Sequence, residues 1–467
     1  MTRTAVINVV GLTPSLLGSA ATPHLNRFLN SGKMVPITPT FPAVTCSAQS
    51  TYLTGLTPTE HGIVGNGWYN RELAEVQFWK QSNHLVHGRK LWEELRQENP
   101  AFTCAKLFWW YNMYSSADYS ITPRPIYPAD GRKVFDIYTA PFSIRSEIKK
   151  DLGEFPFPTF WGPAAGVASP QGPPDAASRW IAESATWIEN KYHPTLSLIY
   201  LPHLDYNLQR LGPGDPRIGA DLSAIDEIVG GLLDFFQRQS VQPIVLSEYG
   251  ITEVDTPVHL NRIFRQKGWL AIKDELGREM LDCGASKVFA VADHQIAHIY
   301  LNDPALESPA RQLLEKQPGI AQVLGRAEQA AFGIDHPRSG DLIAVASERA
   351  WFTYYYWLDD RLAPDFARCV DIHRKPGYDP VELFLDPKLA FPRLKIASRL
   401  LQKQLGFRML MDVIPLDATL VKGSHGIRPA DPRHYPVLIS LQRNLLPEKP
   451  LAATEVYRVI QEHIRSP

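Results

Sequence analysis

Residues 41–55 read FPAVTCSAQSTYLTG, in which a phenylalanine-proline pair leads into Thr45, small polar residues follow, and Gly55 closes the segment. The run from Ser47 to Leu53 is typical of a short helix, and a glycine commonly ends one. Thr45 therefore falls at the start of this predicted helix, where free backbone N–H groups and the helix dipole favour negative charge. Two roles are open to it: the hydroxyl can cap the helix, as threonine often does, or it can act on an anionic group.

The composition predicts a protein with a large buried core. The chain has 467 residues, of which 44% are hydrophobic and 21% are charged, so it is long enough for one large domain or for two to three smaller ones. Its formal net charge is −1, and no basic arm is visible. This balance argues against a nucleic acid polymer as a partner.

The sequence also predicts a cytoplasmic protein. Its four cysteines are widely spaced and form no CxxC pair, so we interpret them as reduced thiols. The apolar run from Ala5 to Leu12 is interrupted by Asn8 and Gly11, which favours a buried first strand over a signal segment. No stretch of about 18 apolar residues occurs, so we expect no membrane span.

Short apolar runs alternate with amphipathic helical patterns along the chain. The predicted helices cover residues 175–192, 220–239 and 261–270. Strands that are nearly continuous in Val, Ile and Leu, alternating with helices, favour an α/β fold with a mostly parallel sheet and helices on both faces. In such sheets the functional site lies at the carboxyl ends of the strands. The predicted strands are residues 4–10, 33–38, 104–110, 195–201, 242–247, 297–301 and 341–347.

Three stretches rich in proline and glycine interrupt this pattern, at residues 120–175, 302–345 and 375–395. The first is also rich in aromatic residues, which favours an elaborated insertion or cap over a flexible linker. We therefore expect a single α/β domain over residues 1–467, with cap or insert segments around 120–175 and 302–395.

Polar side chains follow two of the predicted strands. The strand at 195–201 leads to Asp205 and Gln209, and the strand at 242–247 leads to Glu248 and Tyr249. A late loop, LVKGSHGIRP (420–429), offers His425 between glycines. A threonine hydroxyl at a helix N-terminus, close to carboxylates and a histidine, is the set of groups that metal-assisted phosphoryl transfer requires.

The segment FPAVTCSAQSTYLTGLTPTEHGIVGNGWYN (41–70) resembles the nucleophile segment of the alkaline phosphatase superfamily, and within it the nucleotide pyrophosphatase/phosphodiesterase branch, a relative of phosphonoacetate hydrolase. The resemblance implies an alkaline phosphatase-like core with Thr45 as the nucleophile and Asn66 as an amide that holds a phosphate oxygen. KGSHGIRP is similar to a late motif of the family and makes His425 a metal ligand. The resemblance further implies one or two divalent metal ions, Zn, Mn or Mg.

Several positions depart from the family's metal-binding pattern. Val10 stands where the family has an aspartate, Gln209 and Tyr249 stand where it has histidines, and Glu248 replaces an aspartate. Glutamine and tyrosine can offer oxygen but are poor ligands for zinc, so an oxygen-rich site would suit Mg or Mn better. The predicted metal ligands on these segments are Thr45, Asp205, Gln209, Glu248 and His425.

One further segment could replace the missing ligands. In DFARCVDIHRKPGYDPVELF (365–384), Asp371 and His373 are two residues apart, so on an extended chain they would share one side and could clasp a metal ion. Arg374 and Lys375 could contact a substrate phosphate, as could Tyr249. The alternative is a solvated, charged surface loop.

Two other features have competing interpretations. His294 and His298 have the spacing of two ligands on a helix, but AHIYL (297–301) reads as a strand, so we favour core or rim side chains. The aromatic cluster FWWYNMYSSADY (108–119) could stack on a ring of the substrate, or it could pack a cap.

These observations predict a metal-dependent hydrolase that cleaves a phosphodiester or pyrophosphate bond of a small phosphorylated substrate through Thr45. Two alternatives remain. One is a phosphonate hydrolase that cleaves a carbon–phosphorus bond. The other is a non-catalytic binding or biosynthetic partner with a degraded metal site, for which Val10, Gln209 and Tyr249 argue.

Overall fold

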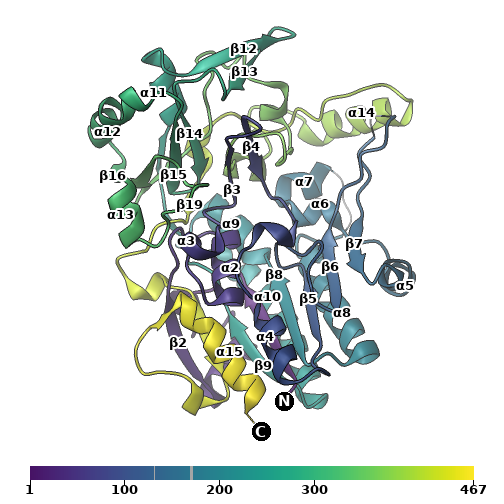
Figure 1. Cartoon of the computed structure of the whole chain (residues 1–467). Coiled ribbons are helices and arrows are strands. Elements are labelled where there is room, and N and C mark those ends of the chain that lie inside the picture. The colour runs from purple at the N-terminus through teal and green to yellow at the C-terminus, as the bar shows by residue number, and fades with distance from the viewer. Residues whose placement is uncertain (131, 169–171, 467) are drawn as a thin grey trace.

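The computed structural model describes residues 1–130, 132–168 and 172–466 (Figure 1). Its largest element is a nine-stranded sheet in the order β21-β2-β20-β9-β1-β8-β5-β6-β7. The strands are β1 (Thr4–Val9), β2 (Lys33–Thr38), β5 (Cys104–Leu107), β6 (Tyr119–Pro123), β7 (Ile137–Ala140), β8 (Leu196–Leu201), β9 (Gln242–Leu246), β20 (Val437–Ser440) and β21 (Leu451–Ala452).

The centre of this sheet is parallel, as the sequence predicts. β1 pairs in parallel with β8 and β9, and β5 pairs in parallel with β6 and β8. Antiparallel pairs occur towards the two edges, between β20 and its neighbours β2 and β9 and between β6 and β7. Every residue of β1 and β8 is buried, which explains why these strands read as continuous apolar runs.

Helices cover both faces of the sheet. On one face, α10 packs against α1, α8 and α9. On the other face, α15 packs against α2 and α4 (Figure 1). The predicted helices at 175–192 and 220–239 are α8 and α10. No helix within the described ranges combines the length and apolarity needed to cross a membrane. The bounds are α1 (Pro23–Ser31), α2 (Thr45–Thr54), α4 (Leu91–Glu98), α8 (Ala176–Tyr192), α9 (His203–Leu211), α10 (Ile218–Arg238) and α15 (Val456–Arg465).

A second, four-stranded sheet lies above the first in Figure 1, in the order β14-β15-β17-β16. All of its pairings are antiparallel. Around it lie β11 (Thr256–Val258), α11 (Leu260–Gln266), β12 (Ala271–Glu275), β13 (Arg278–Asp282), α12 (Glu307–Glu315), α13 (Arg326–Ala331) and β18 (Ala350–Phe352). The sheet strands are β14 (Val288–Asp293), β15 (Ile296–Leu301), β16 (Ile320–Leu324) and β17 (Leu342–Ala346).

One sequence prediction about this region needs correction. The runs at 297–301 and 341–347 do form strands, β15 and β17, but these lie in the antiparallel sheet and not in the parallel one. A two-residue turn between β14 and β15 reverses the chain, so these two strands pair antiparallel. The hydrophobic core of this sheet also includes Val254 and Phe264, well before the predicted insertion at 302–395.

The predicted insertion at 120–175 contributes two edge strands, β6 and β7, to the large sheet. It continues with α5 (Ser143–Leu152), α6 (Phe157–Phe160) and α7 (Pro163–Ala168). Residues 131 and 169–171 of this stretch lie outside the described residues. α6 leads directly to the cavity described below.

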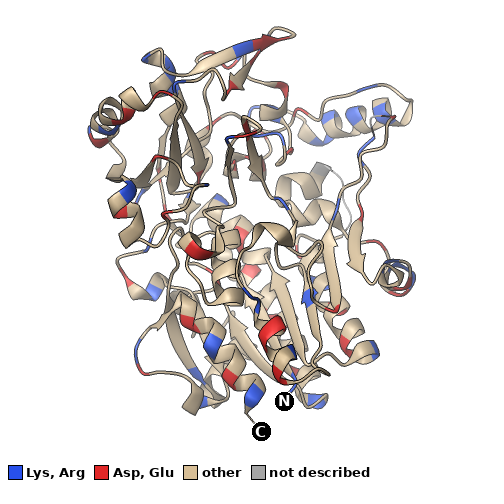
Figure 2. Ribbon diagram, in the orientation of Figure 1, with Lys and Arg blue, Asp and Glu red and all other residues tan. Residues whose placement is uncertain are grey.

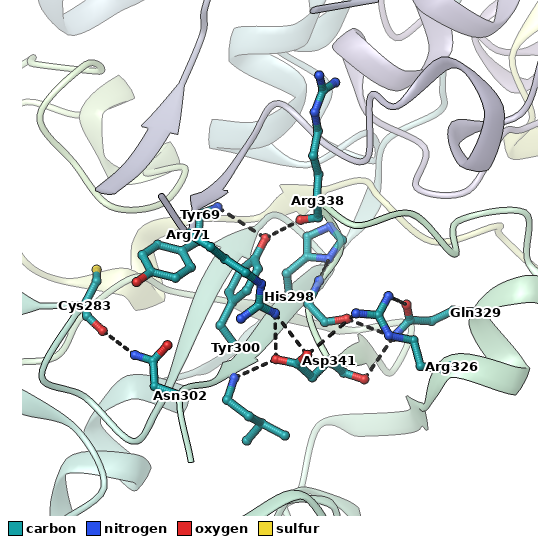
Figure 3. A network of polar contacts seen from close by, with 12 residues as sticks. Tyr69, Arg71, Cys283, His298, Tyr300, Asn302, Arg326, Gln329, Arg338 and Asp341 are labelled. Atoms are coloured by element: carbon teal, nitrogen blue, oxygen red, sulfur yellow. Dashed lines mark hydrogen bonds and ion pairs between the residues drawn. The ribbon is translucent and has the colours of Figure 1, made fainter. Parts of the chain in front are cut away.

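A polar network anchors the segment that follows α2 to the second sheet (Figure 3). The Tyr300 hydroxyl on β15 donates to the carbonyl oxygen of Arg338 at 2.8 Å and accepts from the backbone N–H of Tyr69 at 3.2 Å. Arg71 forms an ion pair with Asp341 at 2.8 Å. Tyr69 lies on β3 (Gly67–Asn70), which pairs with β4 (Glu75–Phe78) in a hairpin. The contacts fix this hairpin against the second sheet.

Lys106 on β5 is buried in the core and makes stability depend on pH. Its ammonium donates to the carbonyl oxygen of Tyr111 at 2.9 Å, and burial lowers its pKa to about 7. Between about pH 7 and 10 the unfolded chain binds this proton and the folded chain does not, so the free energy of unfolding rises with pH by up to about 1.4 kcal/mol per unit. We expect Lys106→Met to lack this rise. Urea melts of the variant and of the unmodified protein at several pH values across that range measure the free energy of unfolding of each. Parallel curves for the two proteins would contradict it.

Candidate functional site

The candidate site lies at the carboxyl ends of the central parallel strands. β8 ends at Leu201, and α9 begins two residues later and carries Asp205 and Gln209. β9 ends at Leu246 and leads to Glu248 and Tyr249. Since β8 and β9 both flank β1, these ends converge at one edge of the sheet. Thr45, at the start of α2, faces the same cavity.

Thr45 does not cap its helix. The N-cap residue of α2 is Val44, with extended backbone angles, and Thr45 is the first helical residue. Its hydroxyl lies 3.2 Å from the hydroxyl of Tyr249. The side chain is buried and contacts the hydroxyl of Tyr249 on another element, and Val44 is the N-cap, so the capping interpretation of Thr45 is excluded.

Asp205 connects these groups in a chain of hydrogen bonds. The Tyr249 hydroxyl donates to Asp205 Oδ1 at 3.0 Å. Gln209 Nε2 donates to Asp205 Oδ2 at 2.7 Å, and the Tyr378 hydroxyl donates to Gln209 Oε1 at 3.2 Å. The chain therefore runs from Thr45 through Tyr249 and Asp205 to Gln209 and Tyr378.

Asp205 and Glu248, two of the buried carboxyl groups of the site, differ in charge at neutral pH. Burial raises the pKa of Asp205 to about 6, although hydrogen bonds from Tyr249 and Gln209 lower it. Burial raises the pKa of Glu248 to about 8. Glu248 Oε1 accepts hydrogen bonds from Gln49 and Asn8. Asp205 is therefore ionised at neutral pH, while Glu248 is mostly protonated.

Four aromatic rings stack across the site. Tyr249 stacks on His425 with ring centroids 3.6 Å apart and planes 7° apart. His425 contacts His294 at 3.7 Å, and His294 stacks on Tyr378 at 3.8 Å. Burial lowers the pKa of both histidines well below the usual range, so both rings are neutral. His425 Nδ1 is 2.8 Å from the carbonyl oxygen of Ala43, which fixes its orientation.

The sequence interpretation of His294 as a core or rim side chain missed its place in the cavity. His294 lies in the turn between β14 and β15 with φ 62°, a left-handed conformation that is uncommon for residues other than glycine. Its Nδ1 is 2.9 Å from Asp293 Oδ1. A tight DHQ turn between two apolar strands was the available signal. The interpretation of His298 as a core residue agrees with its full burial and its contact with the carbonyl oxygen of Val64.

Asn66 does not point into the cavity. Its Nδ2 donates to Asp293 Oδ1 at 3.0 Å, and its Oδ1 accepts from the backbone N–H of Cys46 at 3.0 Å. It therefore ties the first turn of α2 to Asp293 and, through it, to His294.

The loop 365–384 contains four predicted site residues. Within the part of the chain that the structure describes, Lys375 is the one of these four that lines the cavity. Residues 372–374 form a turn and not an extended strand, and the Arg374 N–H donates to the carbonyl oxygen of Asp371 at 3.2 Å, so Asp371 and His373 do not alternate as on a strand. His373 lines a neighbouring cavity, and Arg374 is exposed. Lys375 is buried between Asp379 at 2.7 Å and Glu382 at 2.6 Å, so these carboxylates neutralise its charge.

The side chains around Thr45 do not fit the divalent metal ions that the resemblance implies. A zinc site uses at least three His, Cys or carboxylate ligands that converge on one point. No group of three or more such side chains is arranged to hold a metal ion among the described residues. Both oxygens of Asp205 accept hydrogen bonds, and His425 is sandwiched between Tyr249 and His294. We therefore derive no catalytic step through a metal, and the metal ions that the resemblance implies are at odds with these side chains.

Aromatic side chains dominate the rest of the cavity wall. Trp110 is the member of the 108–119 cluster that lines it, whereas Phe108 and Trp109 lie in the core. α6 and the residue after it supply Phe160 and Trp161. The other aromatic residues of the wall outside the four-ring stack are Trp79, Tyr200 and Tyr206.

Comparisons with known proteins agree with this architecture. An uncharacterized pyrophosphatase/phosphodiesterase of Schizosaccharomyces pombe is 22% identical over 284 residues, so the match spans 56% of this chain and only 49% of that protein. Murine ectonucleotide pyrophosphatase/phosphodiesterase 5 superposes with a TM-score of 0.59 at 14% identity, covering 100% of this chain and 95% of that one. Phosphonoacetate hydrolase from Sinorhizobium meliloti, in complex with phosphonoformate, gives 0.60 at 14% identity, covering 98% and 95%.

The family model for type I phosphodiesterase / nucleotide pyrophosphatase matches residues 4–379. That range contains Thr45, Asp205 and Tyr249, and it covers well over half of the chain. The chain therefore belongs to the type I phosphodiesterase / nucleotide pyrophosphatase family, as the resemblance of residues 41–70 implies.

Proposed function

We propose that the protein hydrolyses a phosphodiester or pyrophosphate bond with Thr45 as the nucleophile, and that Tyr249 and Asp205 take the threonine proton. The direction of one hydrogen bond carries this proposal. Tyr249 has a single hydroxyl proton and donates it to Asp205. In its 3.2 Å contact with Thr45, the tyrosine oxygen is therefore the acceptor and the threonine hydroxyl the donor. That is the orientation in which a base activates a nucleophile.

The proton and charge balance of the reaction follows from this chain. As Thr45 Oγ1 forms a bond to phosphorus, its proton passes to the Tyr249 oxygen while the Tyr249 proton passes to Asp205. The bond from phosphorus to the leaving oxygen breaks, and Asp205 returns a proton through Tyr249 to that oxygen. Water then attacks the phosphorylated threonine and gives its proton to the same base, the bond from phosphorus to Thr45 Oγ1 breaks, and Asp205 returns that proton through Tyr249 to the threonine oxygen as phosphate leaves. The N-terminus of α2 favours the negative charge that develops on the phosphoryl oxygens.

The cavity supports a substrate with an aromatic ring and little charge. Its wall is largely aromatic, and aromatic faces stack on flat rings such as nucleobases. Lys375 is neutralised by Asp379 and Glu382, so it offers little attraction to a doubly charged phosphate monoester. A diester carries one negative charge less than the corresponding monoester dianion. One murine relative is described as an inactive threonine-to-alanine variant in complex with AMP.

Two p-nitrophenyl phosphodiesters and one p-nitrophenyl monoester test this function. We expect nitrophenol release from bis(p-nitrophenyl) phosphate and from the p-nitrophenyl ester of thymidine 5′-monophosphate, with p-nitrophenyl phosphate at least about tenfold slower. Elemental analysis of the same protein by mass spectrometry would decide whether Zn, Mn or Mg is bound. Absence of release from all three compounds, with and without added metal, would contradict the proposal.

Removing the Tyr249 hydroxyl should interrupt the proton path. Tyr249→Phe keeps the ring that stacks on His425, and we expect it to lower kcat about 100-fold. The matched control is Tyr206→Phe, because Tyr206 lines the same cavity but its hydroxyl donates to the carbonyl oxygen of Phe160. Steady-state rates measure both. Equal rates for Tyr249→Phe and the unmodified protein would remove Tyr249 from the path.

A second candidate function is binding without turnover. It is favoured by the lack, within the described part of the chain, of a side-chain group able to hold a metal ion. A binding protein would take up AMP in calorimetry and release no nitrophenol from any diester.

A further inference from the structure

We infer that α14 (Pro392–Gln404) and the residues that flank it dock the protein onto an anionic lipid surface. α14 is an amphipathic helix at the periphery of the molecule, and it packs against α7 (Figure 1). Ile396 is the buried residue of this helix. A helix in a globular protein usually turns an apolar stripe towards the core, whereas most apolar side chains of α14 face solvent.

The exposed apolar side chains form one stripe. Phe391, Leu394, Leu401 and Leu405 are 72%, 67%, 55% and 64% exposed. Their spacing of three, seven and four residues places them along one face of a helix. Phe407, just past the helix, is 66% exposed and extends the patch. An exposed, contiguous apolar surface of this kind marks an interaction site.

Positive charge surrounds this stripe. Residues 387–411 contain six Lys and Arg and no Asp or Glu, although the whole chain has a formal net charge of −1. Figure 2 shows only Lys and Arg coloured along α14. Lys395 and Arg399 pair with Asp412 at 2.9 and 3.0 Å. The remaining cations are Lys388, Arg393, Lys403 and Arg408, and the ion pairs found between described residues do not include them.

The apolar stripe and the cations around it together indicate what kind of partner covers this surface. A second copy of the chain would bring two positively charged helices together, so like charges would oppose pairing through the stripe. Leu and Phe on one face with Lys and Arg beside them are typical of a helix that lies in the plane of an anionic membrane interface. With 13 residues, α14 is too short to span a bilayer, which needs about 20. The helix therefore lies on the surface and does not cross it.

Vesicle sedimentation tests this inference on the full chain. We expect binding to phosphatidylcholine vesicles that contain about 30% phosphatidylserine to be at least about tenfold stronger than to pure phosphatidylcholine, and to weaken with added salt. Leu394→Gln, Leu401→Gln and Leu405→Gln combined should lower the partition coefficient at least about tenfold. Lys403→Gln with Arg408→Gln should lower it about 25-fold, or about fivefold per cation.

Matched control variants distinguish binding through this surface from non-specific binding to vesicles. Leu276→Gln changes a fully exposed leucine elsewhere, and Lys150→Gln with Lys267→Gln removes two exposed cations elsewhere. These variants should bind anionic vesicles as the unmodified protein does. Thermal melts check that all variants fold, which is expected because the changed side chains are exposed.

Three outcomes would overturn the inference. The first is equal binding to neutral and anionic vesicles, and the second is unchanged binding by the triple leucine variant. The third is a change from dimer to monomer in light scattering on the leucine substitutions, which would assign the stripe to a second copy. Because nitrophenol release is not the readout, these results are independent of the proposed hydrolysis.

Discussion

Thr45→Ala is expected to lower nitrophenol release from phosphodiesters by at least about 1000-fold, because no other hydroxyl occupies its position at the start of α2. The fold should persist, since Val44 is the N-cap of α2 and alanine is favourable within a helix. Steady-state kinetics and a thermal melt of the same preparation measure the two effects.

Thr54→Ala is the matched control for this prediction. Thr54 is a buried threonine at the other end of α2, and its hydroxyl donates to the carbonyl oxygen of Ser50 at 2.7 Å. Its loss should leave turnover within about threefold of the unmodified protein. Similar rates for Thr45→Ala and Thr54→Ala would show that Thr45 is not the nucleophile.

Asp205→Asn is expected to lower kcat by about 100- to 10,000-fold, because an amide cannot take the proton that Tyr249 passes on. The unmodified protein should lose kcat/KM as pH falls through about 6, the pKa to which burial raises Asp205, since protonation blocks the base. pH–rate profiles of the unmodified protein and the variant check both statements.

Asp221→Asn is the control for the same chemical change. Asp221 on α10 is a mostly buried carboxylate that contacts His203 at 3.1 Å and Asn207 at 2.9 Å, away from the cavity of Thr45. Its substitution should leave kcat and the position of the acid limb unchanged. If kcat/KM of Asp205→Asn still falls as pH drops through about 6, a group other than Asp205 is responsible for that pH dependence.

The positions of Asp205, Gln209, Glu248 and Tyr249 could be predicted because they depend on a general property of parallel sheets. The side chains that follow adjacent parallel strands meet at one edge, so the order of apolar runs in the sequence was enough to bring them together. Their chemical roles could not be predicted in the same way. The direction of a hydrogen bond depends on differences of less than an ångström between side chains from separate elements.

His294 and the loop at 365–384 show where sequence reasoning ends. His294 reaches the cavity because an antiparallel hairpin places its turn beside His425, where Gln295 N–H donates to the His425 carbonyl oxygen at 2.9 Å. Spacing alone does not reveal such a contact between distant segments. For Asp371 and His373, the prediction of a shared side assumed an extended chain, whereas residues 372–374 form a turn.

The exposed stripe on α14 differs from both cases, because its composition was visible in the sequence while its exposure was not. A helix with Phe391, Leu394, Leu401 and Leu405 on one face is typical of a helix that packs on a core. Instead, Ile396 makes the contact with the core, and this leaves the leucine stripe in solvent.

The most direct test of the account is nitrophenol release by protein that has been dialysed against a chelator and shown by elemental analysis to be free of metal, with Thr45→Ala measured beside it. We expect the metal-free protein to keep its rate within about twofold and Thr45→Ala to have none, because the Tyr249–Asp205 pair takes the threonine proton. A rate that disappears with the metal and returns on addition of zinc or manganese would contradict it.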